Sequence, residues 1–254
     1  MTQQCWNATW ENDMSVLKAV NVVAGYGAGD KVLHEVSLTL AAGQVTALTG
    51  VNGAGKSTLA SALAGRLIPS AGTITLDETE VTRLSIQDRS RRGVVLCPQG
   101  REVFAGLTVA ENIRLGAMTR PSSARKDAVE AIFEMIPVLA QFRSSRAGAL
   151  SGGQQQLVAV GRALAADPKV LIVDEPSMGL APAVVDSVYD LLSDLKETGV
   201  ALLVIEESPL RLVDLADHVV VLRGGEVTTS GGAELLRDEG ILTAALLGEG
   251  AMAK

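Results

Sequence analysis

The stretch 50-GVNGAGKST-58 decides the fold of this chain. It fits G-x-x-x-x-G-K-[ST], the pattern of a glycine-rich loop that wraps phosphate groups. The apolar run 45-VTALT-49 predicts a strand before the loop, and a helix is expected to begin near Lys56. An ordinary glycine turn before a helix would need neither the lysine nor the hydroxyl residue. The sequence therefore predicts a P-loop that binds a nucleoside triphosphate.

Each conspicuous residue of the P-loop has a chemical role. Gly53 and Gly55 let backbone N–H groups curl round the β-phosphate, and the N-terminus of the following helix adds positive potential. Lys56 can reach the β- and γ-phosphates, and Ser57 can ligate Mg²⁺. The predicted nucleotide-binding residues are Gly50, Asn52, Gly53, Ala54, Gly55, Lys56, Ser57 and Thr58.

The surrounding pattern predicts an α/β fold. Short apolar runs recur at 94-VVLC-97, 170-VLIV-173, 201-ALLVI-205 and 219-VVVL-222, mostly with helix-like segments between them, as in a parallel sheet wrapped by helices. Two regions differ. The segments 16–23, 32–40 and 72–77 are strand-like without helices between them and predict an antiparallel patch. Residues of about 108–166 carry helix signals and no good strand, which predicts an inserted helical subdomain.

The second motif is 170-VLIVDEP-176, a buried strand that ends on two carboxylates. In P-loop proteins an acidic residue at such a strand end holds Mg²⁺, which is the role predicted for Asp174. Glu175 beside it can polarise the attacking water as a general base. Alone, an acidic pair after an apolar run is more often a solvated strand end. With a P-loop in the same chain, the functional interpretation is favoured.

The third motif is 150-LSGGQQQ-156, at the start of a predicted helix. Ser151 can cap that helix, and Gly152 and Gly153 leave backbone N–H groups exposed, so this is a second anion-binding helix terminus. One triphosphate does not need two cradles from one subunit. The motif therefore predicts a head-to-tail pair, in which one subunit contacts the nucleotide on its partner's P-loop through Ser151, Gly152, Gly153 and Gln154.

These three motifs, in this order, resemble the nucleotide-binding subunit of ATP-binding cassette (ABC) transporters over about residues 15–248. Within that family, 96-LCPQGREVFAGLTVAENI-113 and 174-DEPSMGLAP-182 are most similar to the LivF-type ATPase subunits of branched-chain amino-acid importers. The resemblance implies a P-loop NTPase (ABC ATPase) core with ATP and Mg²⁺. It further implies that Tyr26 stacks on adenine, and that residues near 100–115 form a groove for a membrane subunit. The implied catalytic residues are Glu175, Gln99 and Lys56, and the implied metal ligands are Ser57, Gln99 and Asp174.

The resemblance also implies partners: a second ABC ATPase subunit (a paralogue or the same chain), transmembrane permease subunits and, indirectly, a solute-binding protein. Nucleic acid is not expected, because the net charge is −7 and the longest Lys/Arg run is Arg91-Arg92. No apolar run is long enough to span a bilayer, and Cys5 and Cys97 cannot form a disulfide framework. We therefore expect a cytoplasmic protein that is peripheral on the inner face of the cell membrane. Tails at 1–14 and 249–254 flank the domain, and the first is expected to be disordered.

Glu207 departs from the family pattern. Most ABC ATPases have a histidine at the end of the strand 201–205 that contacts the γ-phosphate, but here that switch position is Glu207. The two histidines, His34 and His218, lie elsewhere. A carboxylate near a γ-phosphate is repelled, so Glu207 must turn away, be protonated, or bond through water or a cation, and turning away costs least.

The predicted function is an ATP-hydrolysing subunit that powers import of branched-chain amino acids or a related small polar solute. A cassette of another transporter class, or a slow or regulatory ABC ATPase, is the alternative. Soluble ABC proteins of translation or chromosome maintenance are expected to show a second cassette or a long heptad insert, and this sequence has neither. The sequence does not identify the transported solute, nor whether the cassette pair is a homodimer.

Overall fold

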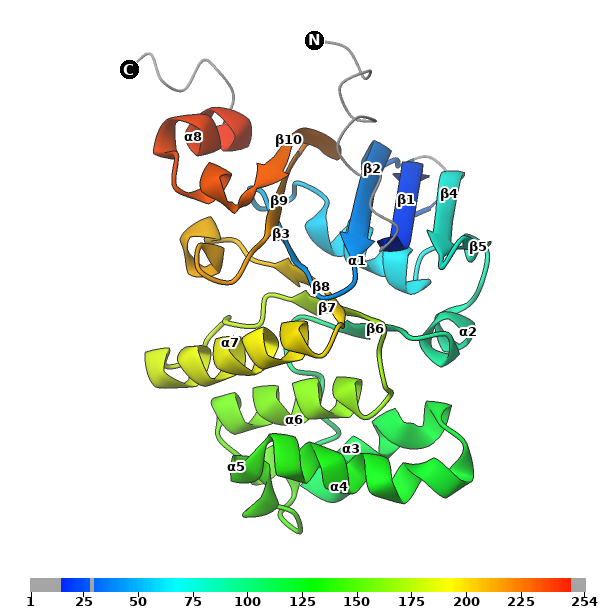
Figure 1. The fold of residues 1–254 in the computed structure, drawn as a ribbon, viewed down its shortest axis with the longest axis vertical. Coiled ribbons are helices and arrows are strands. Elements are labelled where there is room, and N and C mark those ends of the chain that lie inside the picture. Colours follow the sequence, from blue (N-terminus) through cyan, green and yellow to red (C-terminus); the bar gives the residue numbers. More distant parts are fainter. Residues whose placement is uncertain (1–14, 28–29, 248–254) are drawn as a thin grey trace.

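The structure is a computed structural model that describes residues 15–27 and 30–247 (Figure 1). The expectations for the tails at 1–14 and 249–254 lie outside the described residues. The described chain forms a six-stranded sheet with the order β10-β9-β3-β8-β7-β6 and a four-stranded sheet with the order β2-β1-β4-β5. Together with their covering helices, these sheets form the α/β fold that the sequence predicts.

The six-stranded sheet carries the five strands expected from the apolar runs. They are β3 (Val45–Thr49), β6 (Val94–Cys97), β7 (Val170–Asp174), β8 (Ala201–Ile205) and β9 (His218–Arg223), and neighbouring members pair in parallel. Every residue of β3, β7 and β8 is buried, which explains why these segments are continuously apolar. The antiparallel edge strand β10 (Glu226–Gly232) was not predicted, because its half-exposed sequence EVTTSGG has no apolar run.

The antiparallel patch is also confirmed. It consists of β1 (Ser15–Ala24), β2 (Leu33–Ala41), β4 (Ala71–Leu76) and the short β5 (Thr79–Glu80), which sequence patterning missed. The P-loop helix α1 (Lys56–Ala64) lies against β1, β6 and β7, so it is packed between the two sheets. One hydrophobic cluster joins Leu59 and Leu63 of α1 to Leu17 of β1 and Ile172 of β7. This burial holds the P-loop at a defined place above the sheet.

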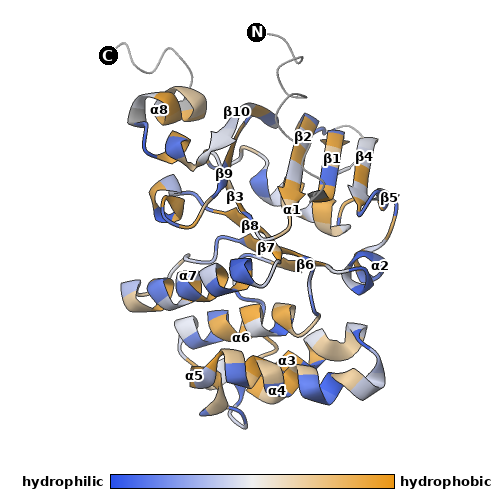
Figure 2. Cartoon of the chain, in the orientation of Figure 1, coloured by the Kyte–Doolittle hydropathy of each residue, from blue (hydrophilic) through white to orange (hydrophobic). Residues whose placement is uncertain are grey.

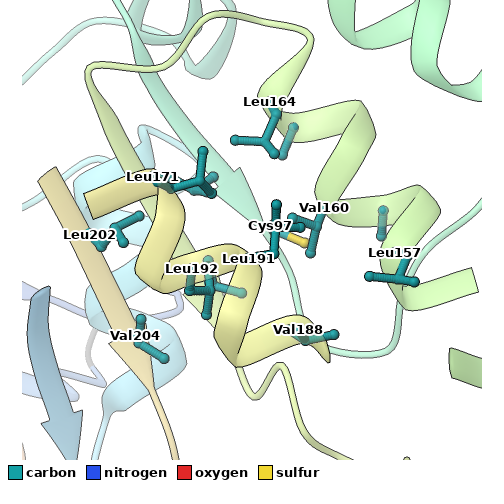
Figure 3. Packing of buried hydrophobic residues seen from close by; sticks show 14 of the residues in the cluster. Cys97, Leu157, Val160, Leu164, Leu171, Val188, Leu191, Leu192, Leu202 and Val204 are labelled. Carbon is teal, nitrogen blue, oxygen red and sulfur yellow. The ribbon is translucent and has the colours of Figure 1, made fainter. Parts of the chain in front are cut away.

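Helices cover the opposite face of the large sheet (Figure 1). Between β6 and β7 the described chain forms helices and short 3-10 turns but no strand. The helices are α3 (Val109–Gly116), α4 (Arg125–Met135), α5 (Pro137–Ala140) and α6 (Gly152–Leu164). Helix α7 (Pro182–Glu197) follows β7, and Figure 2 shows hydrophilic residues along it and hydrophobic residues on the central strands. In Figure 3, Val160 of α6 and Leu191 of α7 pack round Cys97 at the end of β6.

The remaining elements are short. Helix α2 (Ile86–Arg91) precedes β6, and η6 (Ala233–Leu236) and α8 (Glu239–Leu247) follow β10. The segment after Ser208 forms only a 3-10 turn, η5 (Pro209–Leu212). Within the described residues, none of the helices has the length and apolar character needed to cross a bilayer.

Candidate functional site

The P-loop, Asp174 and Glu207 lie at the carboxyl ends of three neighbouring strands. In the order β3-β8-β7, the P-loop follows β3, the dipeptide Glu206-Glu207 follows β8, and Asp174 ends β7. The register places both Leu48 of β3 and Asp174 of β7 beside Ile205 of β8. Because parallel strands end at the same edge, segments that are far apart in the sequence meet here, and ligands bind at such an edge in α/β folds.

The P-loop has the backbone that its glycines allow. Gly53 and Gly55 have φ angles of +79° and +105°, in the left-handed region that glycine adopts without strain. A Cβ on Gly55 would also lie 3.0 Å from Leu33 Cδ2. The buried Lys56 folds its amine into its own loop, where Nζ donates to the carbonyl oxygens of Gly50 at 2.7 Å and Val51 at 3.3 Å. A cationic amine thus sits inside a loop shaped for phosphate.

Asp174 fits the role of a metal ligand. Its side chain is buried, and its Oδ1 has no hydrogen-bond partner, which is costly for a carboxylate unless a cation binds there. Burial raises the pKa of Asp174, a hydrogen bond from Ser57 lowers it, and the nearby charge of Glu175 raises it. The orphaned oxygen, together with the Ser57 hydroxyl, matches the oxygen ligands that Mg²⁺ prefers.

Gln99 and Glu175 lie in direct contact. Gln99 Nε2 donates to Glu175 Oε2 at 2.5 Å and approaches Met178 Sδ at 3.2 Å. Glu175 itself has φ of +50°, and its N–H donates to the carbonyl of Ile205 at 2.9 Å. A non-glycine residue with this backbone must be held by its surroundings. The carboxylate predicted as general base and the glutamine that the resemblance implies as a metal ligand therefore lie in direct contact at the edge of the sheet.

Tyr26 lies in the turn between β1 and β2, and 57% of its surface is exposed. The chain that leaves this turn adjoins the P-loop, since a Cβ on Gly55 would lie 3.5 Å from Val32 Cγ1. An exposed aromatic ring on a turn beside the phosphate loop has a free face for stacking.

The segment 151–154, here called the signature segment, has the predicted cap. Ser151 is the N-cap of α6, with Gln154 N donating to Ser151 Oγ at 3.3 Å and Ser151 N donating to Gln154 Oε1 at 3.0 Å. A Cβ on Gly152 would lie 2.7 Å from Arg101 Nη1, and one on Gly153 would lie 2.5 Å from Val184 Cγ1. Among the described residues, no hydrogen bond connects this segment to the P-loop of its own chain. Within one subunit, the signature segment and the P-loop are thus two separate hydrogen-bonded units in the described residues.

The two glutamates after β8 point to different partners. Glu207 is exposed, and its Oε1 accepts a hydrogen bond from Asn52 Nδ2 of the P-loop at 2.9 Å, so it is directed toward the P-loop and not away from it. Glu206 is buried and accepts from Ser177 N and Tyr189 Oη. Sequence reasoning missed Glu206. The alternation of side chains along a strand was the available signal, because neighbouring residues face opposite sides.

Residues 33–178 match the ABC transporter family. The chain is 35% identical over 227 residues to the high-affinity branched-chain amino acid transport ATP-binding protein BraG of Pseudomonas aeruginosa, covering 89% of this chain and 97% of BraG. It is 31% identical to the lipopolysaccharide export system ATP-binding protein LptB of Haemophilus influenzae, covering 93% and 98% of the two chains. A crystal structure of a nucleotide-free ATP-binding cassette from an ABC transporter superposes with a TM-score of 0.80 at 28% identity, covering 90% of this chain and 98% of that one. With the P-loop, the acidic strand end and the signature segment in place, this chain belongs to the ABC transporter family as an ATP-binding subunit that hydrolyses ATP.

Proposed function

We propose that this chain powers the import of branched-chain amino acids or a related small polar solute. The ATP-hydrolysing part of the proposal is carried by one observation: the P-loop with Lys56 and the pair Asp174-Glu175 lie at the same edge of the sheet, on either side of β8. The choice of solute is supported by the similarity to BraG, which extends over nearly the whole of both chains. The ATP-binding subunit does not itself select a solute, so this part of the proposal depends on its partners.

The chemistry we propose uses the chain's own groups as follows. The P-loop amides and Lys56 hold the phosphates, and Lys56 must leave the carbonyl of Gly50 to do so. Glu175 accepts a proton from the attacking water, and Gln99 positions its carboxylate. Mg²⁺, held by Ser57, Asp174 and Gln99, would neutralise charge on the transferred phosphoryl group.

Two cassettes are proposed to close head to tail, so that each signature segment meets the nucleotide on its partner's P-loop. The N-terminus of α6 is suited to this, because Ser151 is exposed and the first N–H groups of an α-helix have no partner within the helix. Hydrolysis removes the shared phosphate and allows the pair to reopen. Because no helix in the described part of the chain can span a membrane, closure is proposed to act on separate permease subunits from the cytoplasmic face.

A groove suited to a permease segment lies beside the region predicted for it. It has a volume of about 640 Å³ and runs between α3 and α4. Its walls include Leu107, Leu115 and Met118 on one side and Val129 on the other, with Arg114 and Lys126 among its charged residues. An apolar floor with a charged border accommodates an amphipathic helix. We propose that this groove receives a cytoplasmic helix of the permease.

Export is the second candidate function, since LptB is similar to this chain over nearly its whole length.

Uptake of labelled leucine distinguishes the import proposal from the export candidate. Cells that lack this chain should regain leucine uptake when they express the wild-type chain, and should not regain it with Glu175→Gln at equal abundance. If wild-type expression leaves uptake of leucine, isoleucine and valine unchanged while the purified chain hydrolyses ATP, the proposed import of branched-chain amino acids is wrong, and another solute or another transporter class is favoured.

A further inference from the structure

We infer that Glu206 is a positioning residue. It fixes the backbone segment that carries the proposed catalytic carboxylate of Glu175, and so fixes where that carboxylate lies. We call residues 175–179 the catalytic segment. The side chain of Glu206 is buried at the end of β8, with only 2% of its surface exposed. It acts on the segment through hydrogen bonds. The inference rests on the proposed role of Glu175 as general base.

Glu206 is a buried carboxylate with two neutral donors. Its Oε1 accepts from the backbone N–H of Ser177 at 3.1 Å and from the hydroxyl of Tyr189 at 2.9 Å. No lysine or arginine within the described part of the chain forms an ion pair with it. A buried charge is retained only where good hydrogen bonds stabilise it. These two donors therefore fix where the carboxylate lies, and the carboxylate in turn fixes the two donors.

The two donors belong to different elements. Ser177 lies two residues after Glu175, is itself buried, and its Oγ accepts a hydrogen bond from Arg211 of η5. Tyr189 lies on α7, and burial, with the charge of Glu206, raises the pKa of its hydroxyl. The tyrosine consequently remains a protonated donor at neutral pH. Glu206 thus joins the catalytic segment, α7 and the end of β8 at one point.

The catalytic segment is attached to β8 at two successive points. The N–H of Glu175 donates to the carbonyl of Ile205, and the N–H of Ser177 donates to the side chain of Glu206. Between them the backbone passes through the positive φ of Glu175, which a non-glycine residue adopts only under constraint. If the second attachment is lost, the segment can relax and the Glu175 carboxylate moves relative to the attacking water.

The adjacent Glu207 faces the other way, to Asn52 of the P-loop. The double negative charge at the end of β8 therefore consists of two carboxylates with separate tasks. One bonds the loop predicted to hold the phosphates, and the other bonds the segment that carries the predicted base. This accounts for a buried strand that ends on two glutamates.

The test compares Glu206→Ala, Glu206→Gln and Tyr189→Phe in the full chain, with Asp190→Asn on the exposed face of α7 as control. Steady-state hydrolysis gives kcat and KM, a fluorescent ATP analogue gives Kd, and hydrogen exchange reports the amide of Ser177. Because displacement of a reacting group by about 1 Å can cost about a hundredfold, Glu206→Ala should lower kcat by about tenfold to a hundredfold and speed exchange at Ser177. The Kd should stay within about twofold, since the P-loop is untouched.

Glu206→Gln keeps an oxygen acceptor and should restore most of kcat, while Tyr189→Phe removes one of the two donors and should lie between. Wild-type kcat in Glu206→Ala would overturn the inference, as would an equal loss of kcat and of nucleotide binding, which marks a merely structural residue. A kcat of Glu206→Gln as low as that of Glu206→Ala would also overturn the inference. Glu175→Gln is run in parallel: if that variant keeps wild-type kcat, it is the proposed role of Glu175 that fails.

Discussion

Asn52 of the P-loop and Glu207 after β8 are joined by a hydrogen bond of 2.9 Å from Nδ2 to Oε1, although 155 residues separate them. Both side chains are exposed, so the bond contributes little to stability. The bond matters because of where it lies in the site. It holds a carboxylate at the phosphate loop, where the family pattern has a histidine. A negative group beside a bound triphosphate repels it, so Glu207 should slow turnover unless it moves.

Replacement of Glu207 by histidine should accelerate hydrolysis. Removing a repulsion of about 1 kcal/mol corresponds to about a fivefold increase in kcat. Glu207→Gln also loses the charge, but it keeps the hydrogen bond to Asn52 and places no imidazole N–H at the γ-phosphate, so it should change the rate less. Steady-state ATPase rates with and without partner subunits measure this. Loss of activity in Glu207→His within the full complex would show that the carboxylate has a positive role.

Glu175→Gln should leave nucleotide binding intact and remove most hydrolysis. The amide keeps the shape of the side chain and can still bond Gln99, but it cannot accept a proton from water. We expect kcat to fall by about a hundredfold or more, with ATP then trapped in a closed pair of cassettes. Rapid quench kinetics and size-exclusion chromatography with Mg²⁺ and ATP check both parts. Near wild-type turnover in the partner-complete complex would exclude Glu175 as the essential base.

Ser151→Arg should block closure of the pair without affecting binding to the chain's own P-loop. The signature segment has no hydrogen bond to that P-loop in the described residues, so we expect a bulky side chain at its exposed first residue to intrude on the nucleotide of the proposed partner. ATP-dependent association in a Glu175→Gln background measures closure.

Ser151→Ala is the matched control for Ser151→Arg. It removes the helix cap, at a cost of about 1 kcal/mol in stability, but adds no bulk. If isolated Ser151→Arg chains lose ATP binding as well as closure, the proposal that the P-loop and the signature segment of one chain contact different nucleotides is contradicted.

Arg89→Ala should destabilise the fold around the P-loop helix. The guanidinium is fully buried and donates to the carbonyls of Ala62 and Leu63 at the end of α1 and to that of Thr82. Burial lowers the pKa of Arg89 to about 10, so the charge is costly and its hydrogen bonds must offset that cost. Truncation removes a charged donor from three carbonyls and leaves a cavity.

The free energy of unfolding of Arg89→Ala should fall by about 3 kcal/mol, as measured by urea denaturation. Arg91→Ala on the same helix is the control. Its side chain is 66% exposed and pairs with Asp88 at 3.5 Å, so the change should stay within about 0.5 kcal/mol. Similar losses for the two variants would show that Arg89 contributes no more than a surface arginine.

Much of the fold followed from local patterns. Continuous apolar runs predicted β3, β6, β7, β8 and β9, because strands buried on both faces must be apolar throughout. The P-loop and the cap of α6 were predicted since their backbone conformations depend on glycine and serine at fixed spacings. The edge strand β10 was missed, because a half-exposed edge needs no apolar pattern.

The sequence by itself determined the fold class, the phosphate loop and the chemical type of the residues at the strand ends. These are local properties, set by backbone preference, burial and side-chain chemistry over a few neighbouring residues. Only the tertiary structure decided which of two adjacent glutamates faces Asn52 and which is buried against Ser177 and Tyr189. Their side chains leave the strand end in opposite directions, and their partners come from segments 17 to 155 residues away that only the packing of α1, α7 and the sheet brings within bonding distance.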